Sequence, residues 1–186
     1  MRPTSRNAIL EAAFDLLGRR PASTLADIAD HAGVGRATLH RHFSSREVLV
    51  TELTRIAIDE VNAAVDEACK HAESHSDGLR RMLEAILPLG ARHGFLATEP
   101  VGNDPEIAAL MQRDADSLRT EIDAAKREGL FAQDVPTDWI VECFDALIYT
   151  GWRSVRLKQA TPDQAAALAW RTLTSGLSAL SESGLD

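Results

Sequence analysis

Apolar residues recur at helical spacing along almost the whole chain. The first stripe occupies positions i, i+3, i+4, i+7 and i+8 of one segment: Ile9, Ala12, Ala13, Leu16 and Leu17. That spacing places the five side chains on one face of a helix. The most regular later stripes lie in 136–157 and 163–182, and no segment alternates apolar and polar residues as a half-buried strand does. The sequence therefore predicts an all-α fold of about nine helices.

Caps and glycines divide this pattern into helices. Thr24, with Asp27 three residues later, is a variant of the capping box and begins a short second helix. Residues 33–35, Gly-Val-Gly, form a tight turn before a third short helix at about 36–43. The later helices are expected, in chain order, at about 46–71, 79–87, 105–115, 116–128, 136–157 and 163–182.

The charge of the chain is unevenly distributed. The net formal charge is −8, but residues 1–55 carry eight arginines and six acidic residues, a balance of +2 that leaves −10 on the remainder. The first lysine is Lys70, so every fixed side-chain cation in the N-terminal part is an arginine, whose planar group suits phosphates and guanine edges. This asymmetry indicates that only the N-terminal part meets a polyanion such as nucleic acid.

Neither a membrane protein nor a secreted protein is indicated. No apolar run approaches the roughly 20 residues that a membrane span requires. Glu11 and Asp15 interrupt the apolar positions behind the N-terminal arginines, so we expect no secretion signal. Cys69 and Cys143 lie far apart on predicted helices, which fits a reduced, cytoplasmic setting better than a disulfide framework.

Residues 24–46 are the segment that indicates a function. Two short amphipathic helices joined by a glycine turn bury little surface alone, so their apolar side chains must pack on the first helix. That packing leaves one face of the third helix outward: Arg36, Ala37, His40 and Arg41. A helix-turn-helix has this geometry, with its second helix in the major groove of DNA. The alternative is a hairpin in an ordinary bundle, but the outward face lacks the Glu/Lys mixture typical of a solvated helix.

Four spaced motifs in this region resemble the DNA-binding region of the TetR/AcrR family. They are Arg6-x-x-Ile-Leu-x-Ala-Ala13, Thr24-Leu-Ala-Asp-Ile-Ala29, Ala32-Gly-Val-Gly-Arg-Ala-Thr-Leu-His-Arg-His-Phe43 and Ser45-Arg-Glu-Val-Leu49. The resemblance covers about the first quarter of the chain. It implies a three-helix helix-turn-helix domain at 1–46 and a helical ligand-binding and dimerisation domain at 47–186.

In that family the third helix reads the major groove, and this implies roles for residues here. Arg36, Ala37 and Arg41 would face bases, where an arginine bidentate to guanine contributes about 1–3 kcal/mol of discrimination. Five further residues would hold phosphates without reading sequence: Thr24, Thr38, His40, His42 and Arg46.

Three residues depart from the family's usual pattern. His40 stands where Tyr is usual, and its ring reaches less far than a tyrosine. Arg46 stands where Lys is usual and keeps the positive charge. Gly35 stands where Ser or Thr is usual, so we expect the third helix to be capped less firmly.

The resemblance also implies a homodimer on a palindromic double-stranded DNA operator, and a small-molecule ligand that releases the repressor. The stripes of the last two helices, with glycines that permit close approach, give the interface candidates: Leu147, Gly151, Val155, Leu173, Gly176, Leu177 and Leu180. Mostly apolar residues in the middle of the body give the pocket candidates: Met82, Ile86, Leu89, His93, Phe95, Met111, Phe144 and Tyr149. No cofactor is expected.

Two other classes of function stay open. One is an acidic helical small-molecule carrier or enzyme with a vestigial DNA-binding head, and the other is a DNA-binding regulator without an effector. No catalytic motif stands out, so we expect no enzyme activity. Cys69, His71 and His75 have the spacing of metal ligands, but cations at a helix end also suit the local dipole, and no metal site is assigned.

Overall fold

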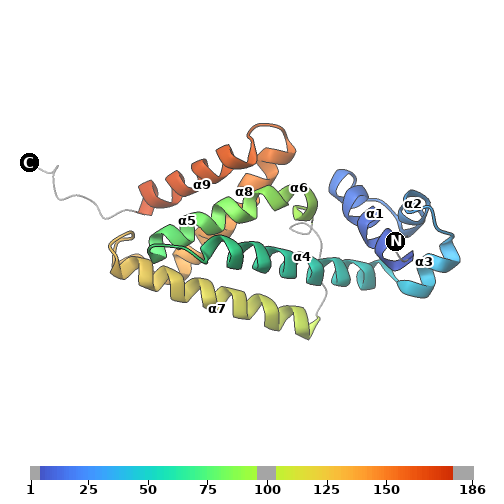
Figure 1. Ribbon diagram of the computed structural model, residues 1–186, viewed down its shortest axis with the longest axis horizontal. Helices are drawn as coiled ribbons and strands as arrows, with labels where there is room; N and C mark the ends of the chain where they lie inside the picture. The colour runs from blue at the N-terminus through green and yellow to red at the C-terminus, as the bar shows by residue number, and fades with distance from the viewer. Residues whose placement is uncertain (1–4, 96–103, 178–186) are drawn as a thin grey trace, which may run out of the picture. The chain divides into compact units, whose positions relative to one another are not determined.

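Apolar stripes and their caps account for the helices of the structure, a computed structural model that describes residues 5–95 and 104–177. All regular elements within these residues are helical (Figure 1), which confirms the all-α prediction. The chain divides into two units. We call residues 1–60 with 91–109 the head unit, and residues 61–90 with 110–186 the body unit. The head unit therefore extends beyond the predicted 1–46, and the functions assigned to the two parts stay predictions.

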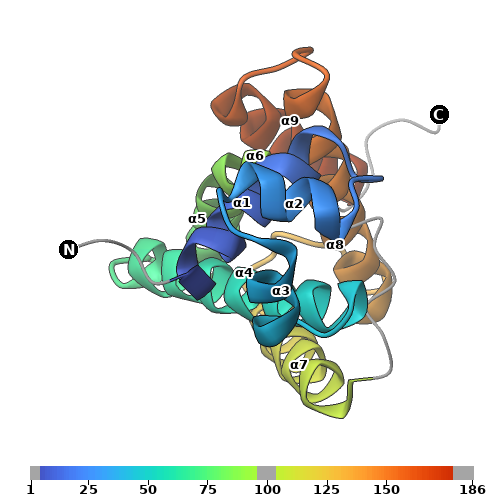
Figure 2. The same cartoon turned by 90° about the vertical axis from the view of Figure 1, so that its right-hand side faces the viewer.

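The head unit is built on three short helices and the first part of a long one. These are α1 (Ser5–Arg19), α2 (Leu25–His31), α3 (Arg36–His42) and α4 (Arg46–Cys69). α1 packs against both α2 and α3 (Figure 2). Their apolar faces form one buried core, whose larger members are Ile9, Phe14, Leu17, Ile28, Leu39, Phe43, Leu49, Leu53 and Phe95. Burial of each such side chain contributes roughly 1.5–3 kcal/mol, which stabilises helices too short to persist alone.

Local hydrogen bonds define the turn between α2 and α3. The Thr24 hydroxyl accepts from Asp27 N at 3.2 Å, and Asp27 Oδ2 accepts from Thr24 N at 2.8 Å, so the predicted capping box is confirmed. Gly33, with a φ of 67°, adopts the left-handed conformation that favours glycine and makes the predicted tight turn. Gly35 caps α3 with no side-chain hydrogen bond, as its identity predicts.

The body unit holds most of the remaining helices. They are α5 (His75–Ile86), the 3₁₀ turn η1 (Leu87–Leu89), α6 (Gly90–His93), α7 (Pro105–Arg127), α8 (Thr137–Arg156) and α9 (Pro162–Leu177). α9 packs against α8 and α5 (Figure 1). The core of this unit includes Leu79, Leu83, Ile86, Leu87, Leu118, Ile122, Phe131, Ile140, Phe144 and Leu173. Three helices, α4, α6 and α7, begin in one unit and end in the other.

Two helices differ from their predicted bounds. The segments predicted as separate helices at 105–115 and 116–128 form the single helix α7, because Ile107, Leu118 and Ile122 are buried along one continuous stripe. α5 begins at His75 rather than near 79. Ser74 Oγ accepts a hydrogen bond from Asp77 N at 3.0 Å, so the polar residues that suggest a break instead cap the helix. No described helix is long and apolar enough to cross a membrane.

Candidate nucleic-acid interface

The reading face of a helix-turn-helix requires one side of its second helix to be exposed, and α3 meets this requirement. Leu39 is 1% exposed and packs in the head core, and Phe43, four residues later, packs in the same core. The opposite side carries four exposed residues: Arg36, Ala37, His40 and Arg41. α3 contains no acidic residue, so its two guanidinium groups give this face a positive charge that suits a polyanion.

Thr24 is exposed at the start of α2, but its hydroxyl is already engaged. Oγ1 donates to Asp27 Oδ2 at 2.7 Å, in addition to accepting from Asp27 N. The hydrogen bond from the Thr24 hydroxyl is the main reason that the pKa of Asp27 lies below its usual range. Because a phosphate oxygen only accepts hydrogen bonds, a contact with this hydroxyl would have to replace Asp27 as its partner.

Arg46 is half-buried at the first position of α4 and is held by the loop between α1 and α2. Its Nη2 donates to the carbonyl oxygen of Pro21 at 2.8 Å. A guanidinium has five N–H donors in one plane, and this contact orients the group at the start of α4. The start of a 24-residue helix adds the positive end of the helix dipole at the same place.

Thr38 and His42 are half-buried, unlike His40.

His42 lines a groove of about 430 Å³ in the head unit. The other residues of this groove come from α1, α4 and the positions next to α3 and α7: Arg6, Phe43, Glu47, Val48, Thr51, Glu52, Arg55 and Asp104. The sequence pattern does not reveal the groove, because its walls come from segments that lie far apart in the chain.

Both arginines of this groove form ion pairs. Arg6 pairs with Glu52, and its guanidinium lies 5.6 Å from the centre of the Phe43 ring. Arg55 Nη2 lies 3.0 Å from Asp104 Oδ2 and 2.7 Å from Glu106 Oε2. The groove thus carries two arginines and three carboxylates, a formal balance of −1, and does not extend the positive face of α3.

Two pocket candidates, His93 and Phe95, lie in the head core. Each is 1% exposed, and their rings pack edge-on against Phe14 with centroids at 5.3 and 6.2 Å. His93 Nε2 lies 2.8 Å from Glu60 Oε2. Burial lowers the pKa of His93, while the charge of Glu60 opposes that shift. Residues 90–95 follow no apolar period, so the sequence gives no signal for this packing.

The remaining pocket candidates do not gather at one place. Three belong to the hydrophobic core of the body unit: Met82, Ile86 and Phe144. Leu89 is half-buried, whereas Met111 is 49% and Tyr149 48% exposed. The structure therefore brings three of the eight candidates together, and a ligand pocket among them stays a prediction.

The interface candidates also differ in their surroundings. Leu173 is buried in the body core, and Leu147 and Val155 pack against it. A Cβ on Gly151 would lie 2.1 Å from Leu87 Cδ1, so the close approach that this glycine permits is to η1 of the same chain. Gly176 is exposed on α9. The side chain of Leu177 and the whole of Leu180 lie outside the described residues.

Large apolar side chains are exposed on the surface of α8 and α9, and none of them is among the interface candidates of the sequence analysis. Trp139 is 61% exposed on α8, and Leu168 is 47% exposed on α9. Tyr149, also on α8, packs edge-on against Trp152 with ring centroids 6.0 Å apart. Exposed large apolar groups on neighbouring helices are typical of a surface that another protein covers.

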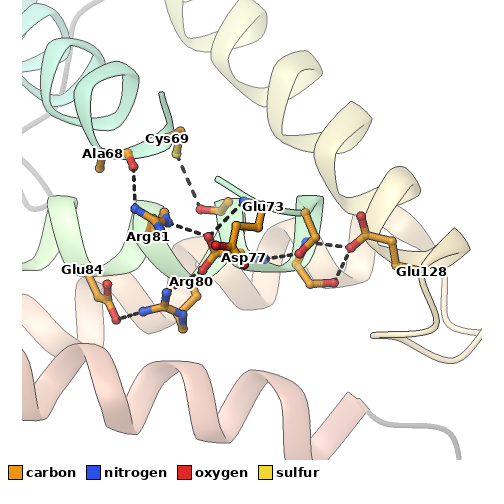
Figure 3. Close-up of polar contacts among 11 residues, drawn as sticks. Ala68, Cys69, Glu73, Asp77, Arg80, Arg81, Glu84 and Glu128 are labelled. Carbon is orange, nitrogen blue, oxygen red and sulfur yellow. Dashed lines mark hydrogen bonds and ion pairs between the residues drawn. The ribbon is translucent and has the colours of Figure 1, made fainter. Parts of the chain in front are cut away.

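The residues with metal-ligand spacing make other contacts. Cys69 Sγ lies 3.6 Å from the carbonyl oxygen of Gly78 (Figure 3), and burial raises the pKa of this thiol. His75 Nδ1 lies 2.8 Å from Glu121 Oε2. Within 5–95 and 104–177, no three His, Cys, Asp or Glu side chains are grouped closely enough to hold a metal ion.

A polar network surrounds the start of α5 in the same region. Asp77 pairs with both Arg80 and Arg81 (Figure 3), and these hydrogen bonds lower the pKa of Asp77 to about 2. Glu128 accepts hydrogen bonds from the backbone N–H groups of His75 at 2.9 Å and Ser76 at 2.8 Å. The network provides hydrogen-bond acceptors for the N–H groups in the first turn of α5 and joins this turn to the end of α7, which indicates a structural role.

Comparison with known proteins extends the resemblance carried by the N-terminal motifs. Residues 9–53 match the family model described as bacterial regulatory proteins of the tetR family. The transcriptional repressor LfrR of Mycolicibacterium smegmatis is 34% identical over 178 residues, which cover 95% of this chain and 92% of LfrR. The transcriptional repressor KstR2 of Mycobacterium tuberculosis is 28% identical over 162 residues, which cover 81% of this chain and 80% of KstR2.

Solved structures match along the whole chain as well. The crystal structure of LfrR in complex with proflavine has a TM-score of 0.78 at 32% identity and covers 95% of this chain and 97% of LfrR. The structure of KstR2 has a TM-score of 0.70 at 22% identity, with 96% and 97% covered, which shows a shared fold. Both the head and the body therefore have counterparts in these regulators.

Proposed function

This chain belongs to the TetR family of DNA-binding transcriptional repressors, and on that premise we propose that it binds a palindromic DNA operator as a cytoplasmic homodimer and is released by a small-molecule ligand. The observation that supports this proposal most is the exposed face of α3, which carries no acidic residue, while the opposite side of the same helix is buried in the head core. Recognition helices of this kind enter the major groove and meet base edges.

The roles of single residues follow from their exposure. Arg36, Ala37 and Arg41 face the bases, because they lie on the exposed side of α3. Phosphates are held by four residues at the edge of that face: Thr38, His40, His42 and Arg46. Thr24 joins them when its hydroxyl exchanges Asp27 for a phosphate oxygen.

The dimer is formed by the exposed side of α8 and α9. Trp139, Tyr149 and Leu168 supply the apolar surface, and Gly176 allows a partner helix to approach closely. Two such pairs of helices form a four-helix bundle with two-fold symmetry. The two reading helices then lie about one turn of DNA apart, about 34–36 Å.

The ligand is a planar aromatic cation such as proflavine, the compound bound in the LfrR structure. The residues beyond 55 carry a net charge of −10, which attracts cations. Asp114, half-buried on α7, accepts a hydrogen bond from Asn62 Nδ2 at 3.3 Å, and burial raises its pKa. A cationic ligand beside this carboxylate would add to the charge of Arg113, which already favours the ionised form, and Met82, Ile86 and Phe144 are the apolar candidates for its rings.

Selection from a random pool of DNA duplexes tests the proposal. We expect a palindromic duplex that binds less tightly as salt rises. Arg36→Ala and Arg41→Ala should each weaken binding by about 5–150-fold, the equivalent of about 1–3 kcal/mol for a bidentate guanine contact. Arg113→Ala, at an exposed arginine of α7 in the body unit, is the control and should bind as the wild type does.

The same assay separates the remaining classes of function. Proflavine should release the selected duplex, since a ligand that favours the released state must weaken DNA binding. Binding to DNA that proflavine leaves unchanged would favour a regulator without this effector. A protein that ignores every duplex at low salt but still binds proflavine would instead be a carrier or an enzyme.

A further inference from the structure

The arginines of the head unit differ in whether a carboxylate already neutralises them. Four of them form ion pairs within the unit: Arg6 with Glu52, Arg19 with Asp15, Arg55 with Asp104 and Glu106, and Arg92 with Glu11 and Glu60. Among the described residues of the head, three exposed arginines form no ion pair: Arg20, Arg36 and Arg41. A guanidinium without a carboxylate loses only water when it meets a phosphate, so these three are the best placed to bind DNA. Two of them lie on α3, and the third lies in the loop between α1 and α2.

Arg19 and Arg20 are neighbours in the sequence, but their surroundings differ. Arg19 Nη2 lies 2.5 Å from Asp15 Oδ1, and Asp15 Oδ2 lies 2.8 Å from Nε2 of His31. Arg20 comes directly after the last residue of α1 and is exposed, and no carboxylate in the described part of the chain pairs with it. The loop therefore begins with one arginine that is paired and one that is open to solvent.

Hydrogen bonds hold the backbone on both sides of Arg20. Its N–H donates to the carbonyl oxygen of Leu16 at 2.8 Å, and Ser23 N donates to the carbonyl oxygen of Arg20 at 3.0 Å. Arg46, which the proposed function assigns to phosphates, donates from Nη2 to the carbonyl oxygen of Pro21 at 2.8 Å. The backbone of Arg20 is thus anchored next to a residue that is held by a candidate phosphate contact, while its side chain faces solvent.

The carboxylate of Asp27 lies within reach of the charges of Arg20 and Arg36. Its hydrogen bonds with Thr24 have the largest effect in lowering the pKa of Asp27, and the charges of both arginines lower that pKa further. Two guanidinium groups and one carboxylate leave a net charge of +1 beside the Thr24 hydroxyl. Without Arg20 this balance would be zero, and the charge of Asp27 would oppose a phosphate more strongly. A phosphate beside Thr24 therefore benefits from the charge of Arg20.

We propose that Arg20 binds a DNA phosphate next to Arg36, so that the loop between α1 and α2 is part of the DNA-binding surface. This contact rests on the proposed function, and it positions the head on the duplex without reading bases. Because a phosphate accepts a lysine as well as an arginine, only the charge at this position is required. Arg19, which Asp15 neutralises, makes no such contact.

Salt titrations of duplex binding by Arg20→Gln and Arg19→Gln test the contact in the full-length protein. Each phosphate contact contributes about −0.9 to the slope of log affinity against log salt. Fluorescence anisotropy with the selected duplex, between about 50 and 200 mM salt, should give Arg20→Gln a slope that is shallower by about 0.9 and an affinity about eightfold lower near 0.1 M. Arg19→Gln is the matched control and should bind as the wild type does. Arg20→Lys should keep the slope of the wild type.

A second pair of measurements separates a phosphate contact from base reading and from a structural role. Arg20→Gln should weaken binding to the selected duplex and to duplexes with single base changes by the same factor, whereas Arg36→Ala should alter the preference among them. The melting temperature of Arg20→Gln should match that of Arg19→Gln. A merely structural Arg20 would lower the melting temperature and weaken DNA binding without changing the salt slope.

The outcomes distinguish this contact from the proposed function. Equal salt slopes for Arg20→Gln and Arg19→Gln in a protein that binds the selected duplex would overturn the contact and leave the proposed function standing. If the selection yields no palindrome, the same titrations use a duplex of random sequence. A shallower slope for Arg20→Gln alone would then support the contact and overturn the reading of an operator. A protein that binds no duplex at low salt would overturn both.

Discussion

His93 is an ionisable residue in the middle of the head core, at the contact between α1, α4 and α6. Phe14 packs on its ring, Glu60 lies 2.8 Å from Nε2, and the charge of Arg92 acts on it from the preceding position. Burial is the largest influence and holds the pKa of His93 below its usual value. The ring is therefore neutral in the folded protein near neutral pH.

Acidification should destabilise the protein through this residue. The unfolded chain takes up a proton below about pH 6.5, whereas the folded chain resists protonation, so the free energy of unfolding falls as the pH drops from there toward the folded pKa. His93→Gln removes this contribution. Denaturant unfolding at about pH 7.5, 6.5 and 5.5 should give the variant a shallower pH dependence, by up to about 1.4 kcal/mol per pH unit. The same dependence of the unfolding free energy on pH in the wild type and in His93→Gln would refute this.

The sequence predicts which side chains are buried and which are exposed wherever the apolar residues follow the helical period. The outward side of α3 follows from the spacing of Leu39 and Phe43, and it is exposed as expected. The contacts of Arg92 with Glu11 could not be predicted, because they join residues 81 positions apart. His93 and Phe95 stand among the pocket candidates of the sequence analysis, because a segment without an apolar period gives no indication of which core it joins.

At the scale of elements, the capping box of α2 combines two roles for Thr24. The hydroxyl satisfies Asp27 N and also donates to the Asp27 carboxylate. α2 has only seven residues, so its first turn is a large part of the helix. The cap is therefore important for holding α2 and the following turn in place beneath α3.

Thr24→Ala should lower the free energy of unfolding by about 1 kcal/mol, the usual effect of losing an N-cap side chain. Thermal or denaturant unfolding measures this loss. Thr24→Ser retains the hydroxyl and is the matched control, which should stay within a few tenths of a kcal/mol of the wild type. An alanine variant as stable as the serine variant would show that the cap contributes little here.

Most helices could be predicted from the sequence, because caps and apolar stripes agree at their ends. The exceptions are instructive. Polar residues after 71 suggest a break, yet Ser74 and Asp77 make them the first turn of α5. Two helices are predicted within 105–128, yet the buried stripe of α7 continues through the whole segment. For α7 the packing of distant residues decides the outcome, and no local pattern shows it. For α5 the signal is local, because Ser74 and Asp77 have the same spacing as Thr24 and Asp27, and the sequence analysis did not use it.

At the scale of the whole molecule, assembly should depend on the exposed apolar side chains of α8 and α9. Leu168→Glu places a charge among them and should convert the proposed dimer to a monomer at micromolar concentration, because an unpaired charge is costly to bury. Sedimentation velocity measures the change. Met111→Glu alters a residue of similar exposure on α7 and should leave the dimer intact. A wild-type protein that sediments as a monomer would contradict this arrangement.

A head core completed by residues 91–95 constrains how such a regulator can be re-engineered. A chimera that joins residues 1–60 of this chain to a foreign body would leave the edge of Phe14 open to water and Glu11 and Glu60 without their arginine. Transplanting its operator preference therefore requires moving the α6 segment together with the N-terminal helices, or exchanging only the surface residues of α3 within the intact chain.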